Sequence, residues 1–480
     1  MTPTSSRPEV VAVLEVGRID VKLLAITPDG RLLSLRSAPN EVRTGDPYPS
    51  CNTEHIWRWM MAALADLGER FAIQAIVPTS YGATAALVNA AELVLPILDY
   101  EADPPAAIAA AYAEIAPWFE ECHCPIEPAG LTLGRQLFWL SRAFPNEFGR
   151  TRWILPFAQY WAWGLAGVPA CEITSLGAQT QLWSPRERDF SSLVHRQGWV
   201  DKLPPLRSAW EILGPLQFEV ANKCKLPVDI PVLCGIQDGG ANLARYLATG
   251  LGDFALISTG ARLLVLQPHL PLEQLDPLRD TVANSDLLGR PVACARFMGG
   301  REHAAIARAQ VGAADAEVAD AEALIAAGTM ALPSFTASGG PFPGSGGKGR
   351  IVGPAPTSLR GRAALASLYV ALMASACLDL LRSRGQVIID GAFADDRLFA
   401  SLLATLRPGQ PVAVSPEREG TALGAALLWG WSERLVPAPL EITRVVAPRV
   451  AGLAGYERRW RSAAEAAGHR SKPRQRPTSG

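Results

Sequence analysis

The chain has 480 residues, more than one hydrophobic core ordinarily holds, and this length predicts two domains. Hydrophobic residues make up 49% and charged residues 19%, a balance that is typical of a globular protein and too apolar for a disordered one. The formal net charge is -1, so no overall field attracts nucleic acid or an anionic membrane surface. Any anionic ligand must therefore be held locally.

The cysteines are spread along the chain, mostly in apolar stretches, as is typical of buried free thiols. Cys122-His123-Cys124 is the only close group, and it lacks a second ligand pair at zinc-site spacing, so we assign it no metal. The first residues, MTPTSSRPEV, contain no basic segment followed by an apolar core, and no apolar run reaches about eighteen residues. We therefore expect a cytoplasmic protein with no membrane segment.

The first half of the chain opens with an antiparallel pattern. Val10–Val16 and Val21–Ile26 are predicted strands, and the turn signal Pro28-Asp29-Gly30 precedes a third. A helix is predicted from Asn52-Thr53 to a glycine stop at Gly68, followed by a strand over Gln74–Val77.

A second opening of the same kind starts at Phe254. A strand, the turn Thr259-Gly260-Ala261 and a strand over Arg262–Leu266 repeat the initial pattern, which indicates two related sheet-based domains with a boundary near residue 250. Phe335–Gly353 is rich in Gly, Pro and Ser and is a predicted loop. A helix over Ala363–Arg384 is expected to end at Gly385, and strands and helices then alternate to Val414, which indicates an α/β fold. We expect the polar tail from about Gly468 to be disordered.

Asp238 stands within Gly235-Ile-Gln-Asp238-Gly-Gly240, between a strand-like run and a short helical run. An Asp at such a junction can accept a proton from an attacking hydroxyl, as phosphate chemistry requires. Asp is also a preferred helix N-cap, which accepts backbone hydrogen bonds. Both interpretations stay open on this segment alone.

Short segments in a fixed order make the pattern more specific. They are Glu15-Val-Gly17-Arg18-Ile-Asp-Val-Lys22, Leu137–Leu140 with Pro145, Gly235–Asp238, Ser258–Ala261, and Asp390–Phe393 with Gly420–Ala426. In this order they resemble the first phosphate motif, a signature, the catalytic segment, the second phosphate motif and the adenosine end of the FGGY family of carbohydrate kinases. The resemblance extends over about residues 8–433.

The resemblance implies an α/β fold of two actin-like (ribonuclease H-like) domains that face an interdomain cleft. We expect an N-terminal sugar-binding domain over 8–250, a C-terminal nucleotide-binding domain over 251–434, and an extension over 435–480. The implied cofactors are ATP and Mg²⁺, and the implied partner is a small-molecule sugar. We expect no nucleic-acid or membrane partner and leave a homodimer open.

The resemblance also implies roles for individual residues. Asp238 would be the general base, and Glu15 would hold magnesium through water. Residues implied in sugar binding are Thr79, Ser80, Tyr81, Gly82, Asp99 and Gln136. Residues implied in nucleotide binding are Gly17, Arg18, Thr259, Gly260, Ala261, Gly300, Gly391 and Ala392.

Several positions depart from the family pattern. Glu15 replaces the usual Asp, Arg18-Ile19 replaces a Thr or Ser pair, and Ala261 replaces a usual Thr, while Gln237 and Asp396 stand where His and Asn are common. The leading hypothesis is ATP-dependent phosphorylation of a ketose-type sugar of the fuculose, rhamnulose or xylulose kind. Its alternative is a sugar-binding or regulatory pseudokinase of the same fold. An unrelated hydrolase of the actin superfamily would not explain the signature at Leu137–Pro145.

Overall fold

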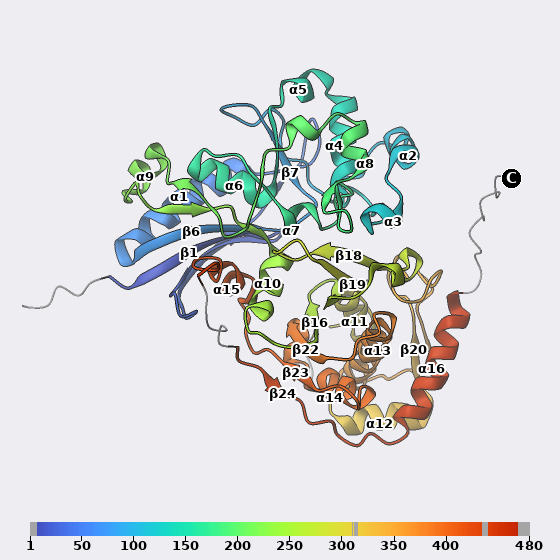
Figure 1. Cartoon of the computed structure of the whole chain (residues 1–480). Coiled ribbons are helices and arrows are strands. Elements are labelled where there is room, and N and C mark those ends of the chain that lie inside the picture. The colour runs from blue at the N-terminus through green and yellow to red at the C-terminus, as the bar shows by residue number, and fades with distance from the viewer. Residues whose placement is uncertain (1–6, 310, 312–314, 434–439, 469–480) are drawn as a thin grey trace, which may run out of the picture. The chain divides into compact units, whose positions relative to one another are not determined.

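The computed structural model describes residues 7–309, 311, 315–433 and 440–468. The chain forms two compact units (Figure 1). The first takes in the described residues up to Gly250, the segment Ala283–Pro291 and the described part of Glu419–Leu440. The second takes in Leu251–Val282, the described part of Val292–Arg418, and the described residues from Glu441 onward. The two units are therefore not separated by a single boundary in the sequence, because two later segments belong to the first unit.

The first unit is built on a sheet in the order β13-β14-β6-β1-β2-β3, with β15 also paired to β6. β1, β2 and β3 are antiparallel neighbours, whereas β6 runs parallel to β1 and to β14. The strands are β1 (Glu9–Val16), β2 (Asp20–Ile26), β3 (Leu32–Pro39), β6 (Ala72–Ser80), β13 (Ile212–Pro215), β14 (Pro231–Leu233) and β15 (Ile236–Gln237).

Core clusters lie on both faces of this sheet. Successive residues of β1 enter different clusters, Val10 one and Val11 the other, as expected for an aliphatic strand covered on both faces. The cluster with Val10 includes residues of α1 (Thr53–Arg70), α6 (Phe157–Ala166) and α9 (Phe218–Cys224). The cluster with Val11 includes residues of α10 (Asp238–Leu247) and α15 (Gly420–Ala426).

The second large sheet repeats this strand pattern in the order β18-β19-β17-β16-β22-β23-β24. β19, β17 and β16 are antiparallel neighbours, and β22 and β23 follow in parallel. The strands are β16 (Phe254–Thr259), β17 (Leu263–Pro268), β19 (Pro291–Phe297), β22 (Gln386–Gly391), β23 (Val412–Val414) and β24 (Thr443–Arg444). The predicted α/β class with two actin-like sheets is confirmed.

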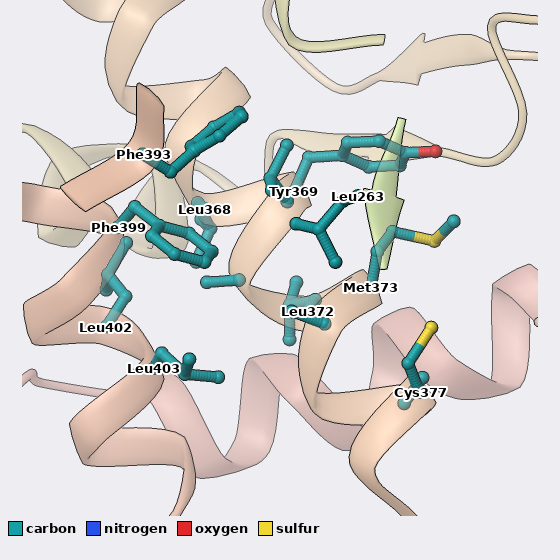
Figure 2. Close-up of a cluster of buried hydrophobic side chains, with 14 of the residues drawn as sticks. Leu263, Leu368, Tyr369, Leu372, Met373, Cys377, Phe393, Phe399, Leu402 and Leu403 are labelled. Carbon is teal, nitrogen blue, oxygen red and sulfur yellow. The ribbon is translucent and has the colours of Figure 1, made fainter. Parts of the chain in front are cut away.

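The core of the second unit centres on the long helix α13 (Leu359–Leu380). Figure 2 shows Leu368 of this helix beside Phe399 of α14 (Arg397–Leu406), whereas Met373 lies on the side of Leu263. Within the described chain, α13 is the one helix long and apolar enough to cross a membrane, but 83% of its apolar window is buried inside the protein. Its apolar character on all sides is that of a core helix.

The C-terminal extension contributes α16 (Leu453–Gly468) to the second unit. Trp460 is fully buried and donates from Nε1 to the Ala331 carbonyl at 2.7 Å, and Tyr456 donates to the Thr329 carbonyl at 2.7 Å. The stretch predicted to be disordered after Gly468 lies outside the described residues.

Two predicted helix ends were wrong because the glycines serve close packing. α1 continues through Gly68 to Arg70, and a Cβ on Gly68 would lie 2.2 Å from Leu226 Cδ2. α13 ends at Leu380, before Gly385, whose added Cβ would lie 2.0 Å from the Asp253 carbonyl oxygen. The predicted loop Phe335–Gly353 also contains a short strand at its end.

The remaining helices of the described chain are α2 (Ala106–Ile115), α3 (Phe119–Cys122), α4 (Leu133–Ala143), α5 (Pro145–Arg150), α7 (Ile173–Leu176), α8 (Ser192–Arg196), α11 (Gly299–Ala307) and α12 (Val318–Ala327), with 3-10 turns at Val200–Lys202, Leu272–Gln274, Pro277–Arg279 and Ala392–Asp395. The remaining strands are β4 (Val42–Arg43), β5 (Ser50–Cys51), β7 (Ala85–Val88), β8 (Trp153–Pro156), β9 (Cys171–Glu172), β10 (Trp183–Ser184), β11 (Asp189–Phe190), β12 (Leu206–Arg207), β18 (Thr281–Ser285), β20 (Met330–Leu332) and β21 (Arg350–Val352). All eight cysteines are buried and none forms a disulfide, which confirms the expectation of free thiols.

Candidate functional site

The ends of three strands bring predicted site residues together in the first unit. Thr79 of β6 pairs with Glu15 of β1 on one side and with Ile236 of β15 on the other. The next residue, Ser80, pairs with Val16 and Gln237 in the same way. Because these strands are parallel, the first phosphate motif, Thr79-Ser80 and the segment before Asp238 end at one edge of the sheet.

The turn before Asp238 is fixed by a glycine. Gly235 has φ of +81°, and a Cβ there would lie 2.3 Å from the Pro78 carbonyl oxygen, so a side chain would force the strands apart. The buried amide of Gln159 donates from Nε2 to the carbonyls of Cys234 and Gly235, each at 3.2 Å. This bracing holds the chain as it enters Asp238.

Asp238 is the first residue of α10, and it is not the N-cap. Gln237 has the capping role, since its Oε1 accepts from Gly240 N at 2.9 Å. Asp238 Oδ1 accepts from Gly239 N at 2.6 Å and from the Gln237 side-chain amide. Burial raises the pKa of Asp238 to about 6, against the lowering effect of these two hydrogen bonds. The carboxyl group therefore titrates far closer to neutral pH than an ordinary Asp.

Glu15 lies in a field of charges at the same edge. Burial raises its pKa to about 7; the positive charge of Lys22 opposes this, while Glu419 and Asp238 add to it. Lys22 Nζ donates to Glu419 Oε2 at 2.9 Å. Glu15 Oε2 is buried and has no hydrogen-bond partner among the described residues. Such an oxygen suits a cation or its water shell.

Arg18 points toward residues implied in sugar binding. Its Nη2 donates to Asp99 Oδ2 at 3.1 Å and to Glu101 Oε2 at 3.0 Å, and its guanidinium lies 5.7 Å from the centre of the Tyr100 ring. Two carboxylates and one aromatic ring thus surround Arg18 in the first unit, and its phosphate contact stays a prediction. Ile19, the next residue, is 83% exposed and offers no hydroxyl.

The implied sugar-binding residues differ in their surroundings. The Tyr81 ring packs against Tyr100 and Phe157, with centroids 5.3 and 5.0 Å away. An added Cβ on Gly82 would lie 3.4 Å from Gln237 Nε2, so this glycine adjoins the segment of Asp238. Gln136 differs, because its amide donates to the carbonyls of Ala83 and Gly130 and thus braces backbone.

In the second unit, three glycine turns pack against one another. An added Cβ on Gly300 at the start of α11 would lie 2.2 Å from the Gly260 carbonyl oxygen. Gly391 has φ of +82°, and its Cβ would lie 2.3 Å from the Thr259 carbonyl oxygen. Only glycine allows backbone to approach backbone this closely, and such turns suit phosphate binding through N–H groups.

Thr259 joins these turns. Its hydroxyl donates to the Asp390 carbonyl and accepts from Phe393 N at 3.0 Å, and it thereby orders Gly391 and Ala392. Ala261 follows Gly260 in this turn and offers only a methyl group. Thr259 thus supports the turn through its side chain.

A cavity of about 760 Å³ adjoins this region of the second unit, lined partly by His303, Ser367, Asp396 and Leu398. Asp396 caps α14 by accepting from Phe399 N at 2.9 Å, and it also accepts from Ser367 Oγ at 2.6 Å. Asp can fill the capping role of the usual Asn. The segment Gly420–Ala426, which resembles the adenosine end, belongs instead to the first unit.

Sequence reasoning gave no role to a buried carboxylate behind Asp238. Glu172 is fully buried at the start of α7, and the Thr174 hydroxyl in that helix accepts from Gln237 N at 3.1 Å. No local signal marked it, because Glu is not among the preferred N-cap residues. Within the described ranges, no group of three or more His, Cys, Asp or Glu residues is arranged to hold a metal ion.

Comparison with known proteins supplies the family. The model for "Carbohydrate kinase FGGY, C-terminal domain" matches residues 251–437. The L-fuculokinase of Escherichia coli (strain K12) is 26% identical over 248 residues, 48% of this chain and 51% of that protein. The match therefore spans about half the length of this curated relative.

Solved structures extend the similarity to nearly the whole chain. A carbohydrate kinase from Novosphingobium aromaticivorans is 30% identical, with 96% of this chain and 99% of that chain covered and a TM-score of 0.87. The xylulose kinase from Lactobacillus acidophilus shares the fold at 15% identity, with the same coverage and a TM-score of 0.79. The chain therefore belongs to the FGGY family of carbohydrate kinases.

Proposed function

We propose that this protein transfers the γ-phosphoryl group of ATP to a hydroxyl of a neutral, ketose-type sugar, with Asp238 as the general base. The observation that carries the proposal is the environment of Asp238. Both of its hydrogen bonds within the described chain reach Oδ1, and its pKa is raised to about 6. A carboxylate whose pKa lies slightly below neutral pH stays ionised and is a suitable general base.

In this mechanism the ionised Asp238 takes the proton of the sugar hydroxyl through Oδ2. The hydroxyl oxygen forms a bond to the γ-phosphorus, the bond from that phosphorus to the bridging oxygen breaks, and ADP leaves. Thr79, whose buried hydroxyl has no partner in the described chain, is a candidate donor or acceptor for the sugar. Tyr81 would supply an apolar wall, and Asp99 would accept from sugar hydroxyls.

The turns of the second unit would bind the nucleotide. The backbone at Gly260, Gly300 and Gly391 would lie close to the phosphates, since none of these residues has a side chain to keep them away. Glu15 would hold Mg²⁺, directly or through water, and the ion would neutralise charge on the β- and γ-phosphates. The unpartnered Oε2 of Glu15 fits this use.

Charge favours a neutral sugar over a sugar acid. The field at Glu15 includes the carboxylates of Asp20, Asp238 and Glu419 against the single ammonium of Lys22. Arg18 is already shared between Asp99 and Glu101. An aldonate would bring another negative charge to this excess, whereas a ketose would not. L-fuculokinase and xylulose kinase, the names of two relatives, suggest ketoses to test first.

We place the activity in the cytoplasm, where cysteines that form no disulfide, such as the eight in this chain, are normally kept reduced. The competing hypothesis is a pseudokinase that binds sugar without phosphoryl transfer. It would follow if Ile19 and Ala261 had removed too many contacts to phosphate.

The test is an ADP-release assay with MgATP over L-fuculose, L-rhamnulose, D-xylulose, D-gluconate and glycerol, together with calorimetric binding of each compound. We expect turnover with at least one ketose and little with gluconate. Binding of a ketose without ADP release would support the pseudokinase, and turnover confined to gluconate would refute the charge argument.

A further inference from the structure

Behind Asp238 lies a fully buried carboxylate that the proposed reaction does not use. Glu172 precedes α7 and accepts four hydrogen bonds from the first residues of that helix. Thr174 N donates to Oε1 at 2.9 Å, and the Thr174 hydroxyl donates to Oε2 at 2.6 Å. Ser175 donates to Oε2 from its backbone N at 3.1 Å and from its hydroxyl at 3.2 Å. The bond from the Thr174 hydroxyl to Oε2 fixes the direction of that hydroxyl.

The Thr174 hydroxyl then reaches the segment of Asp238. Since it gives its proton to Glu172, it can only accept from other groups, and it accepts from Gln237 N at 3.1 Å. Thr174 also packs tightly on this segment, because an added Cβ on Gly240 would lie 2.8 Å from Thr174 Cβ. One side chain therefore both bonds to the residue before Asp238 and fills the space beside α10.

Gln237 carries this restraint to Asp238. Its side-chain Oε1 accepts from Gly240 N at 2.9 Å, and its Nε2 donates to Asp238 Oδ1. Gly239 N donates to the same oxygen at 2.6 Å. The backbone and the side chain of Gln237 are thus held by different partners. Both side-chain hydrogen bonds of Asp238 in the described chain reach Oδ1, so Oδ2 is available to another partner.

We propose that Thr174, oriented by Glu172, is a positioning residue for the general base: it holds Gln237, and Gln237 holds the Asp238 carboxylate so that Oδ2 faces the sugar hydroxyl. The proposal rests on the proposed kinase function and adds to it residues that touch neither substrate. Loss of the Thr174 hydroxyl should therefore lower kcat and leave the KM values for sugar and ATP nearly unchanged.

The decisive variants are Thr174→Val and Thr174→Ser. Valine keeps the shape and removes the hydroxyl, whereas serine keeps the hydroxyl and removes the methyl group. We expect Thr174→Val to lower kcat by roughly tenfold to a hundredfold, and Thr174→Ser to keep kcat within about twofold of wild type. If Thr174 had only a structural role, kcat in both variants would follow their thermal stability, because one variant loses a hydrogen bond and the other loses packing.

Ser175→Ala is the matched control. It removes a hydroxyl from the same carboxylate, but no hydrogen bond runs from Ser175 to Gln237 in the described chain. We expect its kcat to stay near that of wild type. Kinetics are measured with the panel sugar that gives the highest turnover, at a temperature well below the melting temperature of every variant. Equal kcat losses in Thr174→Val and Thr174→Ser, or no loss in either, would overturn the proposal.

A second measurement separates this proposal from the kinase assignment. Hydrogen exchange of the Gln237 amide should be faster in Thr174→Val than in wild type and unchanged in Ser175→Ala, whether or not the protein turns over a sugar. If wild type releases no ADP with any sugar, the proposed function fails and exchange alone decides the positioning of the segment. Unchanged exchange in Thr174→Val would overturn the positioning in either case.

Discussion

The partly buried environment of Asp238 predicts an acid limb in the pH profile of kcat/KM near pH 6. Burial raises the pKa of this carboxyl group to about 6. A general base works only when ionised, so activity is present above this pKa and is lost as the pH falls through it. At pH 5 about one tenth of the enzyme would retain an ionised base, whereas an ordinary Asp with a pKa near 3.9 would be about nine tenths ionised.

The assay is initial-rate ADP release between pH 4.5 and 8 at a sugar concentration well below KM. The terminal phosphate of ATP also titrates near pH 6, so a limb in wild type alone does not identify its source. Gln237→Met provides the control. In the wild type, the Gln237 amide donates to Asp238 Oδ1 and thereby lowers the pKa of the carboxyl group. Gln237→Met removes this hydrogen bond, so the pKa of Asp238 should rise and the acid limb should move to higher pH.

Titration of ATP would be the same in both proteins. A wild-type acid limb near pH 4 would refute the raised pKa of Asp238. A limb that Gln237→Met leaves in place would refute its assignment to Asp238. The variant also loses an N-cap bond, at about 1 kcal/mol, so its stability is measured alongside.

Three further variants test other parts of the site. Arg18→Met should raise KM for the sugar severalfold and leave KM for ATP nearly unchanged, because Arg18 holds Asp99; an effect on ATP alone would restore the phosphate role. Ile19→Thr combined with Ala261→Thr should lower KM for ATP or raise turnover, since each new hydrogen bond to a charged phosphate is worth about 1.5 to 3 kcal/mol; no response in the pair or in either single variant would show that other groups bind the phosphates. Gly391→Ala should destabilise the protein by about 1 to 3 kcal/mol in thermal or urea unfolding and weaken ATP binding, because its backbone is left-handed and lies against a neighbouring strand; a variant as stable as wild type would contradict that geometry.

The fold was largely predictable because its strongest signals are local. β1 and β16 are short aliphatic runs that end in glycine turns, and each is followed by a second strand close in sequence. The helix ends at Gly68 and Gly385 were wrong for a physical reason. The sequence alone does not distinguish a glycine that ends a helix from one that allows a neighbouring chain to approach closely, because the difference lies in the tertiary packing.

The local backbone around the candidate site was predictable from short segments, as at the start of the helix at Asp238 and the glycine turn at Gly391. Contacts between distant segments were not. Lys22 and Glu419 are 397 positions apart, and Arg18 and Asp99 are 81 apart, so no local pattern joins them. The phosphate role of Arg18 stays a prediction, whereas its ion pairs with Asp99 and Glu101 could not be predicted, because an arginine reaches several ångströms from its backbone and tertiary packing decides which carboxylates lie within that reach.

The measurement that tests the central claim most directly is the turnover of Asp238→Asn beside wild type, with calorimetric binding of the best ketose to both. Asparagine has nearly the same shape but cannot take the hydroxyl proton. We predict that kcat falls by about a hundredfold to ten thousandfold while the sugar still binds. Undiminished turnover in Asp238→Asn would remove Asp238 from the role of base and contradict the account.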